Sequence, residues 1–116
     1  MKWWAAGLLT LVVASPAEAA YFDGNQLYTA CTTQQGTYNY FQEQSRCLAY
    51  IEGISDGLEY GRVTQKSSIR ACVPAGVTGG QIMDVVIRYL WQHSEIRHLL
   101  ASQLVTSALI ESFPCR

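Results

Sequence analysis

The sequence predicts an all-α fold: a small domain of four helices, or five with short turns, held together by two disulfides. Apolar residues recur at intervals of three and four positions, which is the spacing of amphipathic helices. Helix-capping residues precede several of these stretches. Four cysteines in a chain of 116 residues add the pattern of a small secreted domain, in which crosslinks supplement a limited core.

The N-terminus has the features of a secretory signal peptide. Lys2 precedes an apolar run that is shorter than the roughly 20 residues needed to span a bilayer. A proline ends the run, and residues 17–19 supply the small-x-small pattern of a cleavage site. We therefore expect residues 1–19 to be removed and residues 20–116 to form one domain in the periplasm. A retained membrane anchor is the alternative.

Composition and motifs argue against catalysis and against cofactors. The net charge of -1 does not favour nucleic acid or an anionic membrane as a partner. His93 and His98 do not share a helical face and have no cysteine or carboxylate at ligand spacing, so we expect no metal. No nucleophile elbow, phosphate loop or dinucleotide fingerprint occurs. We expect a protein that is not an enzyme and has no cofactor.

The first helix is expected to begin after an N-cap at Asp23 or Asn25 and to end near Thr33. Leu27 then lies on the same side as the first cysteine. The polar residues 32–46 contain a glycine and are expected to form a turn that leads into the second helix.

The second helix is expected over residues 46–61. Gly53, Gly57 and Gly61 recur there at four-residue spacing, and each glycine inside a helix costs roughly 1 kcal/mol relative to alanine. The repetition suggests that another backbone comes close. We expect a neighbouring helix of the same domain at this flank, and a groove for a partner is the alternative. The core face carries Cys47, Ile51, Ile54 and Leu58.

Three carboxylates, Glu52, Asp56 and Glu59, occupy the remaining face of this helix. Paired carboxylates can perform acid and base chemistry when their surroundings separate their pKa values. Because these three stand away from the apolar stripe, we interpret them as a solvated acidic face.

The segment after the helix, residues 62–74, is polar, has no clear periodicity and is expected to form a surface loop. Arg62, Lys66 and Arg70 make it locally positive. A loop on a rigid scaffold often carries recognition, and an ordinary solvated connection is the alternative.

The third helix is predicted over residues 81–93 by Thr78 and Gln81, which have the spacing of a capping box. Its core stripe consists of Ile82, Val85, Val86, Tyr89 and Leu90. A second apolar track at four-residue spacing consists of Met83, Ile87 and Trp91.

The fourth helix is expected over residues 94–113, with Ser94 as its cap. It is apolar most of the way round, which favours either a central helix or a dimer contact. As a hypothesis, the third and fourth helices form a homodimer through the track of Met83, Ile87 and Trp91.

Four cysteines allow three pairings. Cys31 and Cys47 flank a single turn, while Cys72 and Cys115 bracket the hairpin of the third and fourth helices, so we expect these two pairs. By chain entropy the first crosslink contributes roughly 3 kcal/mol and the second roughly 4 kcal/mol.

Three stretches together resemble the Rap/Tai immunity proteins, periplasmic antidotes to peptidoglycan amidases delivered by type VI secretion. They are FDGNQLYTAC, CLAYIEGISDGLEYG and CVPAGVTGGQIMDVVIRYLWQHSEIRHLLASQLVTSALIESFPC. The similarity covers residues 22–115. This chain has Ser94 where the family pattern has a proline, which changes a helix cap. The resemblance implies an all-helical, disulfide-bonded fold, often homodimeric, that binds an amidase and occludes its catalytic cleft.

We therefore expect a periplasmic immunity protein that inhibits an amidase effector. A periplasmic chaperone or general protein-binding module is the alternative. As a hypothesis, the target meets the acidic face of the second helix and the positive loop that follows, at Glu52, Asp56, Glu59, Arg62, Lys66 and Arg70.

Overall fold

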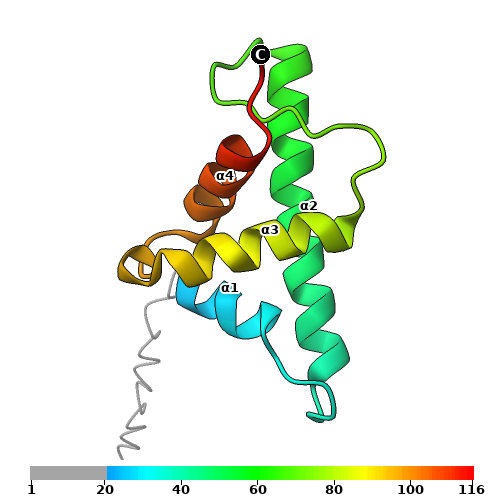
Figure 1. The fold of residues 1–116 in the computed structure, drawn as a ribbon, viewed down its shortest axis with the longest axis vertical. Helices are drawn as coiled ribbons and strands as arrows, with labels where there is room; N and C mark the ends of the chain where they lie inside the picture. The colour runs from blue at the N-terminus through cyan, green and yellow to red at the C-terminus, as the bar shows by residue number, and fades with distance from the viewer. Residues whose placement is uncertain (1–20) are drawn as a thin grey trace, which may run out of the picture.

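A long helix, α2 (Tyr40–Thr64), forms the axis of the fold in the computed structural model, which describes residues 21–116 (Figure 1). Three further α-helices pack on it: α1 (Gly24–Cys31), α3 (Gly79–Gln92) and α4 (Ala101–Ser112). A short 3-10 helix, η1 (Ser94–Ile96), lies between α3 and α4. The predicted all-α class and the four main helices are confirmed for the described part of the chain.

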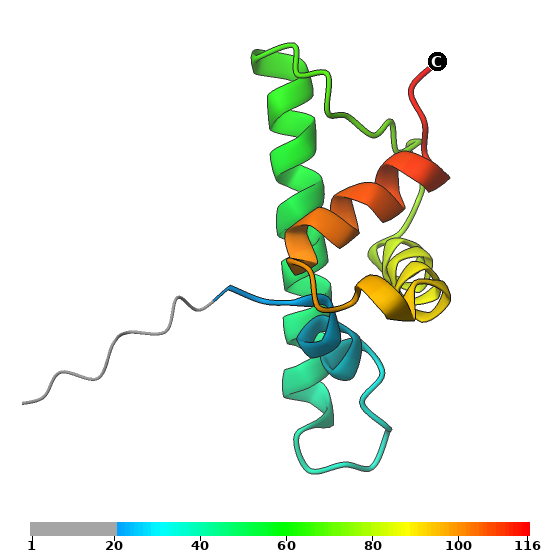
Figure 2. The same cartoon turned by 90° about the vertical axis from the view of Figure 1, so that its left-hand side faces the viewer.

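The helices α1, α3 and α4 lie on one side of α2, so the opposite side of α2 faces solvent (Figure 2). The predicted signal peptide lies outside the described residues. Within residues 21–116, no helix combines the length and the apolar character that a membrane crossing requires.

Helix α1 begins at a capping box, with Asp23 rather than Asn25 as the N-cap. The Asp23 carboxylate accepts a hydrogen bond from the backbone N–H of Gln26 at 2.8 Å, and the Gln26 side chain accepts one from the backbone N–H of Asp23 at 3.0 Å. This reciprocal pair satisfies backbone donors that a helix start leaves free.

Helix α2 is longer than predicted at both ends. Its first turns, from Tyr40, were expected to belong to a turn, because they are polar and show no core stripe. They nevertheless consist mainly of good helix formers and start after Gly36, whose φ of 94° lets the chain reverse. At the other end α2 runs to Thr64, so Arg62 lies in its last turn and not in the following loop.

The predicted contact between a neighbouring helix and the glycine flank of α2 is wrong. A Cβ added at Gly53 or Gly57 would meet nothing within 4 Å, and one at Gly61 would meet only Ser67 Cβ, at 3.6 Å. The four-residue spacing of the glycines shows that they share one flank of α2, but it does not show whether another helix covers that flank.

Helix α3 begins at the predicted capping box. The Thr78 hydroxyl accepts from the Gln81 backbone N–H at 3.2 Å, and the Gln81 side chain accepts from the Thr78 backbone N–H at 2.8 Å. Val86 and Leu90 of the predicted core stripe are fully buried.

The predicted single helix over residues 94–113 is wrong, because the chain breaks between η1 and α4. Ser94 is the first residue of the 3-10 helix, whose N-cap is His93, whereas the N-cap of α4 is Leu100. The Ala101 N–H donates to the Phe22 carbonyl at 2.8 Å, and the Gly24 N–H donates to the Leu99 carbonyl at 2.9 Å. These bonds to the start of α1 use backbone groups that a continuous helix would need for itself.

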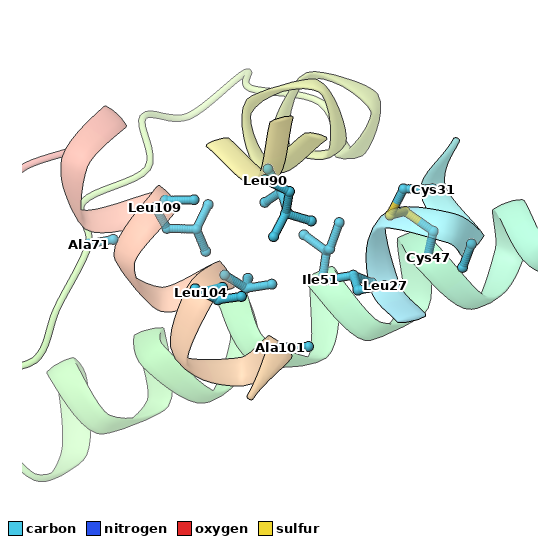
Figure 3. Packing of buried hydrophobic residues seen from close by; sticks show 13 residues of the cluster. Leu27, Cys31, Cys47, Ile51, Ala71, Leu90, Ala101, Leu104 and Leu109 are labelled. Carbon is cyan, nitrogen blue, oxygen red and sulfur yellow. A yellow bond between two sulfur atoms is a disulfide. The ribbon is translucent and has the colours of Figure 1, made fainter. Parts of the chain in front are cut away.

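The core lies where α1, α3 and α4 pack against α2 and against one another. In Figure 3, Leu90 of α3, Ile51 of α2 and Leu104 of α4 point toward one another. Helix α4 contributes five of the buried residues and is therefore central within the single chain, while a dimer contact stays a prediction. The buried core consists of Leu27, Ala30, Cys31, Cys47, Ile51, Ala71, Val86, Leu90, Ala101, Leu104, Val105, Ala108 and Leu109.

Both predicted disulfides are present. The bond between Cys31 and Cys47 joins α1 to α2 inside the core (Figure 3). The bond between Cys72 and Cys115 joins the connection that precedes α3 to the end of the chain.

Candidate functional site

A cleft of about 490 Å³ lies beside the C-terminal half of α2, and we call it the α2 cleft. Three of the six predicted partner-binding residues line it: Asp56, Glu59 and Arg62. Because the helix places residues three and four apart on one surface, these charged side chains stand next to one another along its rim. The sequence had assigned Arg62 to a separate loop, whereas the structure joins it to the acidic face.

The other three predicted residues lie outside the cleft lining. Glu52 reaches the start of α3, where its Oε1 would lie 2.8 Å from a Cβ added at Gly79. Lys66 and Arg70 are exposed in the connection after α2, and Lys66 has a positive φ of 49°. The predicted positive loop is therefore present as an exposed segment, but only Arg62 contributes its charge to the α2 cleft.

Glu59 and Arg62 form a two-point ion pair at the rim. The Arg62 Nε donates to Glu59 Oε2 at 2.9 Å, and the Nη2 donates to Oε1 at 2.5 Å. These hydrogen bonds hold the pKa of the Glu59 carboxyl below its ordinary value and raise the pKa of Arg62. Because both side chains are exposed, the pair orients the guanidinium more than it stabilises the fold.

Asp56 is an exposed carboxylate at the same rim. Neither of the ion pairs found among residues 21–116 includes Asp56: they join Arg46 to Glu43 and Arg62 to Glu59. Its negative charge is thus available to an incoming group.

Ser55 also lines the cleft, although the sequence did not identify it as a candidate site residue. Its hydroxyl oxygen is buried and has no hydrogen-bond partner within the part of the chain that the structure describes. A serine beside an apolar stripe gave no signal that it would line a cavity, because this depends on the opposite wall.

That opposite wall is formed by the chain just before α3. Ala71, Cys72, Val73 and Pro74 line the cleft, and the Cys72 N–H donates to the Phe113 carbonyl at 2.8 Å. The disulfide to Cys115 fixes the same residue, and Figure 2 shows this connection passing beside the end of α4. The floor is apolar and comes from all three longer helices, through Leu58, Ile82 and Leu109.

The predicted dimer track has two different environments. Met83 and Ile87 are half-buried and pack against the core, whereas Trp91 is 68 % exposed. Trp91 is therefore the member of the track that offers a large apolar surface to a partner.

The arrangement is suited to binding a protein surface. Among the described residues, no group of three or more His, Cys, Asp or Glu side chains could hold a metal ion. The Nδ1 of His93 lies 2.8 Å from the Tyr89 carbonyl oxygen of its own helix, and the two rings stack. The α2 cleft offers a charged rim, with two carboxylates and one guanidinium, and an apolar floor.

Comparison with protein families identifies the class of molecule that carries this cleft. The family model described as Rap1a immunity proteins matches residues 23–115, from the cap of α1 to the second disulfide. The chain belongs to the Rap1a immunity protein family. The match includes all of the helices described above, so the fold belongs to the immunity domain itself. As the name of the family states, its members confer immunity, which implies that this Rap1a family protein binds an effector protein. Searches of curated proteins and of solved structures returned no match.

Proposed function

We propose that this Rap1a family protein is a periplasmic immunity protein that binds a peptidoglycan amidase effector of a type VI secretion system and occludes its active site. The observation that carries the proposal is the family match over residues 23–115. In this proposal the protein acts by binding and is not itself an enzyme.

The disulfide-bonded fold is consistent with the proposed periplasmic location. Two disulfides tie down a small core, and disulfides persist in oxidising compartments such as the bacterial periplasm. The N-terminal sequence has the pattern of a secretory signal, which would carry the chain there. An amidase that attacks peptidoglycan from the periplasm would meet its antidote in the same compartment.

The surface proposed to meet the effector is the rim of the α2 cleft together with the exposed segment that follows α2. It contains Asp56, Glu59 and Arg62 at the rim and Lys66 and Arg70 beyond it. Glu52 completes the predicted set one turn earlier on α2. Charged residues at the rim of an interface set the orientation and rate of association.

A homodimer is part of the proposal, with Trp91 at its contact. Tryptophan is enriched where protein surfaces meet, and this side chain is largely exposed in the single chain. Met83 and Ile87 lie on the same track of α3 as Trp91 and pack against the core. They therefore anchor the helix that carries the proposed contact.

The test begins with the effector, obtained by co-purification from the periplasm of cells that express the protein at its natural level. Arg62→Glu, Lys66→Glu and Arg70→Glu are then combined, and neutralisation of the effector's amidase activity is measured. We expect inhibition to weaken by at least about tenfold, since several favourable rim contacts become repulsive.

Arg88→Glu serves as the matched control, because Arg88 is exposed on α3 and lies outside the cleft lining. Thermal unfolding of each variant separates loss of binding from loss of folding. Undiminished inhibition by the triple variant would rule out this surface. Absence of any cell-wall amidase among the co-purified proteins would rule out the proposed function.

A further inference from the structure

We propose that the disulfide between Cys72 and Cys115, which we call the outer disulfide, is a redox switch for the α2 cleft. Reduction of this bond by a dithiol frees one wall of the cleft and weakens binding of the effector, while the helices stay packed. The inference rests on the proposed function and adds a way in which the same surface is controlled.

The two disulfides differ in their exposure. Cys31 and Cys47, which form the inner disulfide, are 5 % and 0 % exposed and belong to the buried core. Cys72 is exposed, and Cys115 is half-buried. The rate of thiol–disulfide exchange depends on access, because a thiolate must reach one of the two sulfurs. A reductant in solution should therefore attack the outer disulfide before the inner one.

Few contacts besides the outer disulfide hold the wall of the cleft. Residues 71–74 form this wall and lie in no helix. Within the described part of the chain, one backbone hydrogen bond joins them to another element, from the Cys72 N–H to the Phe113 carbonyl at 2.8 Å. This bond and the outer disulfide both tie Cys72 to the residues that follow α4. Ala71 is the one wall residue in the buried core, and its side chain is a single methyl group.

The helical core does not depend on the outer disulfide. All buried core residues except Ala71 lie in the four α-helices, and the inner disulfide joins α1 to α2 among them. A weakly held segment can open at a lower free energy than the whole fold requires for unfolding. We therefore expect reduction of the outer disulfide to free the wall without unfolding the helices.

A free wall removes one side of the proposed effector surface. The charged side chains of the rim stand on α2, and the wall lies across the cleft from them. A mobile wall has to be ordered again whenever a partner binds, and this ordering lowers the affinity. The surface is thus complete only in the oxidised protein. In a reducing cytosol both cysteines would be thiols, so the chain would acquire this surface only after export.

The chemistry of the switch is thiol–disulfide exchange with a dithiol. A thiolate of the dithiol attacks one sulfur of the outer disulfide, whose S–S bond breaks as a mixed disulfide forms. The other cysteine leaves as a thiolate and takes up a proton. The second thiol of the reductant then loses its proton and displaces the first cysteine, so the reductant departs as a disulfide. Two electrons have passed to Cys72 and Cys115, and a disulfide-bearing oxidant reverses the exchange.

The first measurement exposes the oxidised protein to dithiothreitol, a small dithiol, without denaturant. Free thiols are alkylated with iodoacetamide at successive times, and mass spectrometry of the peptides locates each modified cysteine. We expect Cys72 and Cys115 to be modified at least about tenfold faster than Cys31 and Cys47. Circular dichroism should remain helical while only the outer disulfide is reduced. Equal rates for all four cysteines, or earlier modification of the inner pair, would overturn the inference.

The second measurement uses the co-purified effector and keeps the reductant away from it. Cys72→Ser/Cys115→Ser mimics the reduced outer disulfide, because serine has nearly the shape of a free cysteine. We expect this variant to keep its helices and to bind the effector severalfold more weakly than the wild type. Equal binding by the two proteins would overturn the inference. Loss of the helices in the variant would also overturn it, because the bond would then serve the whole fold.

Two controls tie the effect to the outer disulfide. Wild-type protein that is reduced, desalted and reoxidised should bind the effector as the untreated protein does, since the exchange is reversible. Brief treatment of the serine variant with dithiothreitol, followed by desalting, should leave its binding unchanged. A further loss of binding in the treated variant would show that the inner disulfide is the sensitive one, against the inference.

Failure of this inference can be told apart from failure of the proposed function. Thiol trapping needs no effector, and NMR signals of the Ala71 and Val73 amides report during reduction whether the wall is freed. If the serine variant and the wild type neutralise the effector equally, the switch is wrong while immunity stands. If the wild type binds no effector at all, the proposed function is wrong whatever the cysteines do.

Discussion

A Cβ added at Gly24 would meet the Leu104 side chain and would lie 2.7 Å from the Arg97 carbonyl oxygen. That carbonyl cannot retreat easily, because it accepts a hydrogen bond from the Asn25 N–H at 2.9 Å. Gly24 is therefore needed for close packing of α1 on the chain before α4. Gly53 and Gly57 are exposed in the middle of α2 and have nothing within 4 Å.

These environments predict opposite effects of the same substitution. Gly53→Ala and Gly57→Ala should each raise the free energy of unfolding by about 0.5–1 kcal/mol, since alanine loses less backbone entropy and fits the open space. Gly24→Ala should lower it by about 1–3 kcal/mol through overpacking. Urea denaturation monitored by circular dichroism measures all three. A destabilised Gly53→Ala variant would show that the flank of α2 is covered in solution.

At the scale of elements, the two disulfides stabilise different parts of the fold. Cys31 and Cys47 join α1 to α2 among buried side chains, at a sequence separation of 16. Cys72 and Cys115 span a separation of 43 and hold the wall of the α2 cleft. The longer closed loop restricts the unfolded chain more, so its crosslink should contribute about 4 kcal/mol against about 3 kcal/mol for the shorter one.

Removal of the second disulfide should loosen the cleft before it unfolds the helices. In a Cys72→Ala/Cys115→Ala variant we expect faster hydrogen exchange at the backbone amide of position 72, which in the wild type donates to the Phe113 carbonyl, and little change in α1. The matched Cys31→Ala/Cys47→Ala variant should show the reverse pattern. Hydrogen exchange read by mass spectrometry distinguishes them, and uniform acceleration in both variants would contradict separate tasks for the two bonds.

At the scale of the whole molecule, the unexplained feature is exposed aromatic surface. Trp91 lies near the end of α3 and is 68 % exposed, although the same helix buries Val86 and Leu90 completely. A tryptophan in water leaves a large apolar area uncovered, which a second copy of the chain would bury.

The proposed dimer gives a direct prediction for this residue. The wild-type protein should sediment as a dimer, and Trp91→Glu should sediment as a monomer, because the substitution places a charge in a desolvated contact. The neighbouring exposed position supplies the control: Gln92→Glu adds the same charge and should remain dimeric. A wild type that is monomeric across micromolar concentrations would end the proposal.

Features that depend on nearby residues were predictable from the sequence. The capping box of Thr78 and Gln81 acts over three residues, and the core positions of Val86 and Leu90 follow from helical spacing. The cysteine pairs followed from the order of the helices that they flank. Asp56 and Glu59 of the cleft rim were also identified, because charge on a helix face away from the apolar stripe marks a surface, whereas Arg62 was identified only as part of a positive loop.

Only the tertiary structure decided the features that join distant parts of the chain. The break before α4 depends on the hydrogen bond from Ala101 to Phe22, and no local pattern encodes a bond between residues so far apart. The glycine flank of α2 is open because the other helices pack elsewhere on α2. The α2 cleft exists because the segment around Cys72 lies across from α2. Hydrogen bonds and periodicity within a helix are set by a few neighbouring residues, whereas a cleft exists only once separate elements have packed.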